Sequence, residues 1–258
     1  MLVFFLRWYD FRTAVFWCLQ QISNILSRRT ETGCYMSRNS KRFKYIRIVL
    51  LSLVASLLLG NANYLTTLFS SEYIAAIKEK YGADAAERVS DWKALLDKGQ
   101  DEGDWIRIHQ VNDFFNEHIK YASDLEHWGK EDYWATPIES LGTGAGDCED
   151  YAIAKYVSLR AMGVPDSKLR IMYVRALSVN EPHMVLLYIE EDGSVPMVLD
   201  NLNPKIKPAT RRADLKPIYG FNAEGLWLAK AQGLGRKVEG KTGGSNWQDL
   251  LNRIEKGM

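Results

Sequence analysis

A chain of 258 residues that is 47% hydrophobic and 25% charged has enough apolar side chains for a sizeable core, which excludes a disordered or collagen-like protein. The net charge of +1 conceals an asymmetry, because residues 1–62 carry 9 Lys/Arg and 2 Asp/Glu whereas the remainder carries 24 and 30. The remainder therefore has a net charge of −6, which provides no basic surface for nucleic acid.

Residues 36–62 have the three parts of a secretory signal peptide. Five basic residues come first, twelve mostly apolar residues follow from Ile48 to Leu59, and small residues stand at Gly60 and Ala62. An apolar run of this length is too short for a membrane-spanning helix, which needs about 20 residues. We therefore predict cleavage after Ala62 and no stable membrane insertion afterwards, with an uncleaved membrane anchor as the alternative.

Residues 1–35 precede a signal peptide that has its own methionine, Met36. We expect them to be a spurious extension from a start codon assigned too early; an amphipathic membrane-surface segment is the alternative. Two of the three cysteines, Cys18 and Cys34, lie there, so the exported body keeps only Cys148 and cannot form an internal disulfide. A lone exported thiol is either buried and inert or reactive.

Helical periodicity dominates residues 70–121, where apolar residues recur every three or four positions. Gly82 and residues 98–104 divide this segment, so the pattern predicts three helices. A long polar and aromatic loop is predicted at 123–147, and loops of that length are more often functional than idle.

In the second half of the exported body, the pattern predicts one helix followed by several strands. Residues 148–162 carry few charges and end before Gly163, which predicts a largely buried helix with a glycine stop. Extended runs are predicted at 168–176, 183–190, 194–200 and 216–222, with the turn EDG joining the second and third as a hairpin. We accordingly divide the chain into an extension (1–35), a signal peptide (36–62), a main domain (63–232), and a linker with a C-terminal amphipathic helix (233–258).

Cys148 is the first candidate catalytic residue. It stands at a predicted helix N-terminus, where the helix dipole favours a thiolate, and a nearby imidazole would accept its proton. Of the four histidines, His109 and His118 lie on opposite faces of one helix, because nine residues turn the helix through about 900°. His127 in the long loop and His183 at the start of a strand remain candidates.

Asp200 closes the neighbouring strand and could fix the tautomer of the imidazole. Each residue also has an ordinary interpretation: His183 could be satisfied at a strand end, and Asp200 could cap the following turn. The order Cys148, His183, Asp200 along one helix and two strands favours a catalytic triad over three independent structural roles.

Several motifs between about residues 90 and 225 resemble, in the expected order, the LapG family of bacterial transglutaminase-like cysteine proteinases: VNDFFNEHIKYASD, DYWATPIESL, GDCEDYAIAKY, LRIMYVRA, HMVLLYIE, VLDNLNP and RRADLKPIYGFN. The resemblance implies an α+β, papain/transglutaminase-like fold in which the helix that bears the nucleophile packs on an antiparallel sheet. By motif, the family's nucleophile falls on Cys148, its histidine on His183 and its aspartate on Asp200.

The resemblance also implies calcium beside the active site, bound through Asp147 and Glu149, which flank the thiol. A hard divalent cation prefers oxygen ligands and would neutralise these carboxylates. The alternative is that acidic residues at this point only stabilise the helix N-terminus. Asp150 could be a ligand, a cap or neither.

By the same resemblance we expect a calcium-dependent periplasmic cysteine endopeptidase. Its implied substrate is a large repeat-containing adhesin, which it cuts next to a pair of alanines and so releases from the cell surface, dispersing biofilm. Its implied inhibitor is an inner-membrane receptor for cyclic di-GMP. An amide-crosslinking transglutaminase and an inactive binding module with the same fold are the alternatives.

Overall fold

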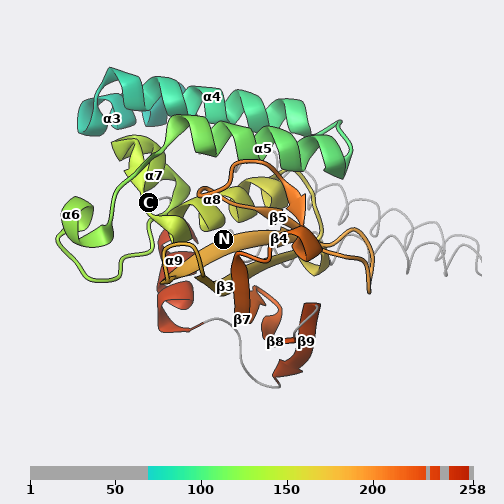
Figure 1. Ribbon diagram of the computed structural model, residues 1–258. Coiled ribbons are helices and arrows are strands. Elements are labelled where there is room, and N and C mark those ends of the chain that lie inside the picture. Colours follow the sequence, from blue (N-terminus) through green and yellow to red (C-terminus); the bar gives the residue numbers. More distant parts are fainter. Residues whose placement is uncertain (1–68, 231–232, 239–243, 256–258) are drawn as a thin grey trace, which may run out of the picture. The chain divides into compact units, whose positions relative to one another are not determined.

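The computed structural model describes residues 69–230, 233–238 and 244–255 (Figure 1). From Ile74 onward the chain forms one compact unit, and a second unit, Arg7–Tyr73, contributes only residues 69–73 to the described part. The signal peptide and the extension predicted at 1–62 lie outside the described residues. Within the described ranges, no helix combines the length and hydrophobicity that crossing a membrane requires.

Three helices occur where the periodicity predicts them: α3 (Ser71–Tyr81), α4 (Ala83–Gly99) and α5 (Asp104–His118). Gly82 separates the first two with a φ of 96°, which a residue with a Cβ rarely adopts. The buried residues of α4 and α5 follow helical spacing and include Val89, Trp92, Leu96, Ile108, Val111 and Phe115. Each of these two helices therefore packs through one apolar face.

Segment 123–147 is not the single loop that the sequence predicts. It contains α6 (Asp124–Trp128), α7 (Pro137–Thr143) and β2 (Ala145–Gly146), which pairs in parallel with β1 (Lys120–Tyr121). A capping box starts α7: the Thr136 hydroxyl accepts from the backbone of Glu139, whose carboxylate accepts from the backbone of Thr136. Helices this short depend on caps and tertiary contacts, so hydrophobic periodicity does not detect them.

The helix predicted at 148–162 is α8 (Cys148–Ala161), and it is buried along most of its length. It ends as predicted, at a glycine with positive φ, Gly163. Helix α8 lies between α5 on one side and strands β3 (Leu169–Ala176) and β4 (Glu181–Tyr188) on the other (Figure 1). The structure is therefore built around α8.

The main sheet has seven strands in the order β6-β5-β4-β3-β7-β8-β9, and all neighbouring strands are antiparallel. Besides β3 and β4, its strands are β5 (Met197–Leu199), β6 (Lys207–Pro208), β7 (Leu215–Asn222), β8 (Gly225–Lys230) and β9 (Gly233–Val238), and single 3-10 turns occupy Asp166–Lys168 and Ala209–Arg211. The predicted hairpin between β4 and β5 is present, although its connection is longer than EDG. The α+β prediction is confirmed.

The C-terminal segment belongs to the same compact unit. Strand β9 pairs with β8, so the linker expected after residue 232 begins instead as a strand of the sheet. The predicted amphipathic helix is α9 (Ser245–Glu255), whose fully buried Trp247 packs edge-on against Tyr156 of α8 and Phe221 of β7. Glycine and lysine are poor strand formers, which is why the composition did not predict β9.

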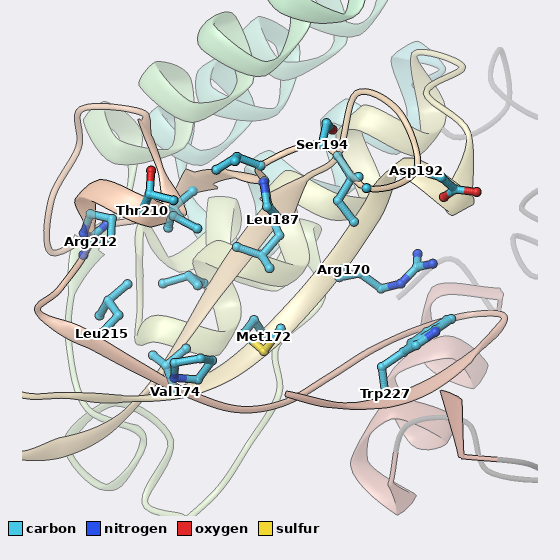
Figure 2. Close-up of a pocket in the computed structure, with 18 of the residues that line it drawn as sticks. Arg170, Met172, Val174, Leu187, Asp192, Ser194, Thr210, Arg212, Leu215 and Trp227 are labelled. Carbon is cyan, nitrogen blue, oxygen red and sulfur yellow. The ribbon is translucent and has the colours of Figure 1, made fainter. Parts of the chain in front are cut away.

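The two faces of the sheet are covered differently. Alternation along β3 and β4 directs one set of side chains to α8 and the other set to the opposite face. That opposite face carries an apolar cluster of Met172, Val174, Val185, Leu187 and Val198. These residues form the floor of a cavity of about 810 Å³ with Arg170 and Trp227 at one end and Arg212 at the other (Figure 2).

The packing of α9 generates a stability prediction. Trp247→Ala should lower the free energy of unfolding by about 3–5 kcal/mol, because it removes a fully buried indole and leaves a cavity between α8 and β7. Trp105→Ala is the matched control, since Trp105 is 56% exposed and its loss should cost far less. Urea denaturation measures both values, and equal losses would show that α9 does not contribute to the core.

Candidate active site

Cys148 is the first residue of α8, as the sequence predicts. The helix start is fixed by Asp150, one of whose carboxylate oxygens accepts from the backbone N of Asp147 at 3.3 Å and the other from Ala135 N at 2.7 Å. Asp150 is fully buried. Of the three roles left open for Asp150, the structure shows that of a helix cap, which also ties the loop before α7 to the nucleophile's helix.

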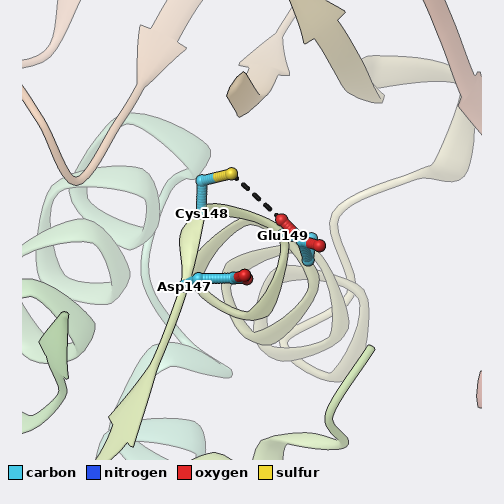
Figure 3. A group of neighbouring side chains, drawn as sticks. All are labelled: Asp147, Cys148 and Glu149. Atoms are coloured by element: carbon cyan, nitrogen blue, oxygen red, sulfur yellow. Dashed lines mark hydrogen bonds between the residues drawn. The ribbon is translucent and has the colours of Figure 1, made fainter. Parts of the chain in front are cut away.

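The thiol lies in a negatively charged environment. Cys148 Sγ is 3.0 Å from Glu149 Oε2, and a carboxylate oxygen of Asp147 belongs to the same group, in which the candidate ligand atoms of the three residues lie within 4.8 Å of one another (Figure 3). Burial raises the pKa of Cys148, and the charges of Glu149 and Asp147 raise it further; a hydrogen bond from the backbone of Met184 acts in the opposite direction. With these carboxylates ionised and unpaired, the thiol keeps its proton.

His183 and Asp200 form a buried hydrogen-bonded pair. His183 Nε2 is 2.7 Å from Asp200 Oδ1, and the two side chains are 4% and 0% exposed. This contact places the proton on Nε2 and leaves Nδ1 as the acceptor. His183 and Cys148 line the same cavity of about 680 Å³.

Asp200 has further partners that keep it ionised and oriented. Its Oδ2 accepts from Arg212 Nη2 at 2.6 Å, and its Oδ1 also accepts from the backbone N of Leu202 at 3.1 Å. Burial alone would raise the pKa of Asp200, but the contacts with His183 and Arg212 outweigh it and lower the pKa to about 2. Both sequence interpretations of Asp200 are therefore present, since it caps a turn and also holds the imidazole.

The other three histidines, His109, His118 and His127, are not among the described residues that line this cavity. His118 Nδ1 contacts the backbone oxygen of Phe114 in its own helix, and His127 packs against a tryptophan. Of the two candidate bases, His183 lines the cavity of the thiol and His127 does not.

The cavity of Cys148 is bounded by three parts of the chain. Residues 121–149 supply one wall, the sheet supplies Tyr173, His183 and Tyr219, and residues 244–246 at the start of α9 supply the third side. The cavity thus has an aromatic side on the sheet and an acidic side at the helix start. Sequence reasoning missed the third side, because nothing in the C-terminal segment indicates that it reaches the site.

Carboxylates from two segments meet beside the thiol. Asp147 and Glu149 are joined by Asp124 and Asp132, since candidate ligand oxygens of Asp124, Asp132 and Glu149 lie within 4.8 Å of one another, as do those of Asp124, Asp147 and Asp150. The sequence prediction named only Asp147 and Glu149. Asp124 and Asp132 were missed because they lie in segment 123–147, where several acidic residues carry no local signal that singles out two.

This cluster has the chemistry of a site for a hard divalent cation. Asp124 Oδ1 and Asp147 Oδ1 are buried without a hydrogen-bond partner. Burial and the neighbouring carboxylates raise the pKa of Asp147 to about 10 and also raise the pKa of Asp124. Unpaired carboxylate oxygens at this density require either protons or a cation, and a divalent ion with oxygen ligands satisfies them together.

The comparisons with known proteins agree with this geometry. A family model described as bacterial transglutaminase-like cysteine proteinase matches residues 83–214, a range that includes Cys148, His183 and Asp200. No curated protein sequence matches the chain.

Solved structures of LapG from Legionella pneumophila are similar to this chain at 40% identity. One covers 71% of this chain and 96% of its own, with a TM-score of 0.60. The calcium-bound and EGTA-treated structures of that protein also cover 71% of this chain, and 98% and 96% of their own, each with a TM-score of 0.61. The family match over more than half of the chain and this identity together show that the chain belongs to the family of bacterial transglutaminase-like cysteine proteinases.

Proposed function

We propose that this protein is a calcium-dependent cysteine endopeptidase whose catalytic triad is Cys148, His183 and Asp200. The observation that carries the proposal is that His183, which lines the same cavity as the thiol at the start of α8, makes a buried hydrogen bond to Asp200. That bond leaves Nδ1 of the imidazole free to act as a general base.

The reaction follows from these groups. Cys148 Sγ attacks the carbonyl carbon of the scissile peptide while His183 Nδ1 takes the thiol proton, and the imidazolium then gives that proton to the departing amine. A thioester between enzyme and substrate remains. Water attacks it with His183 again as the base, and the thiol and a carboxylic acid are released. Asp200 orients the imidazole and stabilises its charged form throughout.

Calcium would be held by Asp147 and Glu149, as the sequence resemblance implies, together with Asp124 and Asp132. Their clustering and the unpaired oxygens of Asp124 and Asp147 support this assignment. The ion would neutralise the carboxylates that raise the pKa of the neighbouring thiol. The similarity to a calcium-bound LapG structure supports calcium rather than magnesium, and calcium also tolerates an irregular ligand geometry that magnesium does not.

Family membership and the similarity to LapG support a specific biological role. The substrate would be a large repeat-containing adhesin, cut next to a pair of alanines in its N-terminal region so that it leaves the cell surface and biofilm disperses. The protease would act in the periplasm after removal of the signal peptide. An inner-membrane receptor for cyclic di-GMP would inhibit it by sequestration.

Substitutions in the triad should abolish cleavage while leaving the fold intact. Cys148→Ala, His183→Ala and Asp200→Ala should each lower the cleavage rate by at least about 10³-fold, because members of a catalytic unit act together. His127→Ala is the control and should retain activity, since His127 lies outside the cavity. The rate at which an adhesin N-terminal fragment is cleaved measures the effect. Wild-type activity in Cys148→Ala would exclude this mechanism.

Calcium should stabilise the protein as well as activate it. A saturating concentration of about 100 times the dissociation constant should contribute about 2.7 kcal/mol, because the unfolded chain does not assemble the site. Asp147→Ala, Glu149→Ala, Asp124→Ala and Asp132→Ala should each reduce the calcium-induced rise in melting temperature, whereas Glu87→Ala on the exposed face of α4 should not. A calcium response unchanged in all four variants would show that these carboxylates do not hold the ion, and that Asp147 and Glu149 only stabilise the start of α8.

The products decide between hydrolysis and amide crosslinking. Incubation of the enzyme with a purified adhesin N-terminal fragment that contains adjacent alanines should give two smaller fragments, because water resolves the thioester. Electrophoresis and mass spectrometry identify the products. A single larger species would indicate that an amine resolves the thioester, and an unaltered fragment with every adhesin tested would favour a binding role.

A further inference from the structure

The backbone of Asp200 is held as firmly as its side chain. Its carbonyl oxygen accepts two hydrogen bonds, from Lys155 Nζ at 3.2 Å and from Asn116 Nδ2 at 3.0 Å. These donors come from α8 and α5, two elements far from Asp200 in the sequence. The orientation of the Asp200 carboxylate therefore depends on groups beyond its own strand.

Lys155 is buried and makes a full set of hydrogen bonds. It is 1% exposed, and besides Asp200 O its ammonium contacts Asn112 Oδ1 at 3.0 Å and Asn116 Oδ1 at 2.8 Å. The amide orientations are fixed because the Nδ2 groups donate elsewhere, that of Asn112 to Pro204 O at 2.7 Å. Three oxygen acceptors match the three hydrogens of an ammonium group.

No carboxylate in the described part of the chain forms an ion pair with Lys155. Burial lowers its pKa to about 7, while Asp200 and Asp113 act in the opposite direction. Burying a charge without a counterion is costly even when it is hydrogen-bonded, and an apolar side chain of similar size would usually fit such a place at lower cost. The three hydrogen bonds offset that cost only where this geometry is kept.

The position of Lys155 on α8 relates it to the nucleophile. It follows Cys148 by seven residues, which is about two turns, so the two side chains lie on the same side of the helix. The same rigid helix thus carries the thiol at its start and, through the ammonium, the peptide group of Asp200 farther along. Asn112 and Asn116 lie four residues apart on α5. Asn116 donates to the backbone oxygen of Asp200, and Asn112 donates to that of Pro204.

We propose that Lys155, supported by Asn112 and Asn116, is a positioning residue of the active site that fixes the backbone of Asp200 and thereby the imidazole of His183. This inference rests on the proposed triad. Because Asp200 Oδ1 holds Nε2 of His183, a shift of the Asp200 backbone turns the imidazole away from the thiol. Misplacement by about 1 Å can lower the rate of such a reaction by about 10²-fold.

The test compares two lysines changed in the same way. Lys155→Met removes the contact with Asp200 O, and Lys168→Met is the control because Lys168 pairs with Asp104 instead. Asn116→Ala is a second test that leaves Lys155 in place. The calcium-saturated enzyme is treated with iodoacetamide, alkylation at Cys148 is followed by peptide mass spectrometry, and the low-field ¹H resonance of the His183 Nε2 proton is recorded.

Lys155→Met and Asn116→Ala should alkylate at least about tenfold more slowly than the wild type and should shift or lose the His183 resonance. Lys168→Met should match the wild type in both measurements, and all three should keep the calcium-induced rise in melting temperature. Wild-type alkylation and an unmoved resonance in Asn116→Ala and in any folded Lys155→Met would overturn the proposal, as would equal changes in Lys168→Met. If His183→Ala alkylates like the wild type, the triad itself is wrong, which is a separate result.

Discussion

The central constraint in this structure is the burial of α8. The helix carries Asp150, Lys155, Ser158 and Arg160 into the interior, and every one of these polar groups needs a partner there. The surrounding elements supply those partners. The backbone before α7 donates a hydrogen bond to Asp150. Lys155 donates to α5 and to the segment after β5, and Arg160 donates to the turn after α8. An indole of α4, that of Trp92, donates to Ser158. The polar contacts of one helix thus fix the placement of its neighbours.

This arrangement explains how a thiol and an imidazole from distant parts of the chain come to line one cavity. Hydrophobic packing of α8 on β4 brings the two elements together, but because it is non-directional it does not fix the position of the helix along the strand. The directional contacts of Asp150 and Lys155 remove that freedom, since each links α8 to a segment that also carries a residue of the site. The placement of Cys148 and His183 therefore depends on buried polar groups that do not line their cavity.

The acidic surroundings of the thiol have a related consequence. Electrostatic repulsion from Glu149 and Asp147 opposes the thiolate, and the dipole of α8 is too weak to overcome several carboxylates in a buried site. A cation at the proposed site would be bound by the same carboxylates and would neutralise them, which would remove that repulsion. Under the proposed assignment, the negative charge that opposes the thiolate at the start of α8 is the charge that would bind calcium.

The sequence predicted those features that depend on residues close together in the chain. Helix α8 was predicted from its apolar run and its glycine stop. His183 and Asp200 were chosen as candidates because of their places on two neighbouring strands. Asp124 and Asp132 were missed, as were Lys155 and Arg212, because their roles arise only when separate segments fold onto the site. The short helices α6 and α7 and strand β9 were missed because caps and pairing partners, rather than hydrophobic periodicity, stabilise them.

The last helix shows how far such long-range contacts extend. Asn246 Nδ2 donates to Asp132 Oδ2 at 2.7 Å, and Arg253 contacts Glu139 Oε2 at 2.7 Å and the hydroxyl of Tyr133 at 3.1 Å. Helix α9 therefore holds the loop that supplies Asp132 to the carboxylate cluster, while its first residues form one side of the cavity of Cys148. Because the buried Trp247 anchors α9 to α8 and β7, the wall of the cleft, the candidate metal ligands and the nucleophile's helix are connected through one packed core.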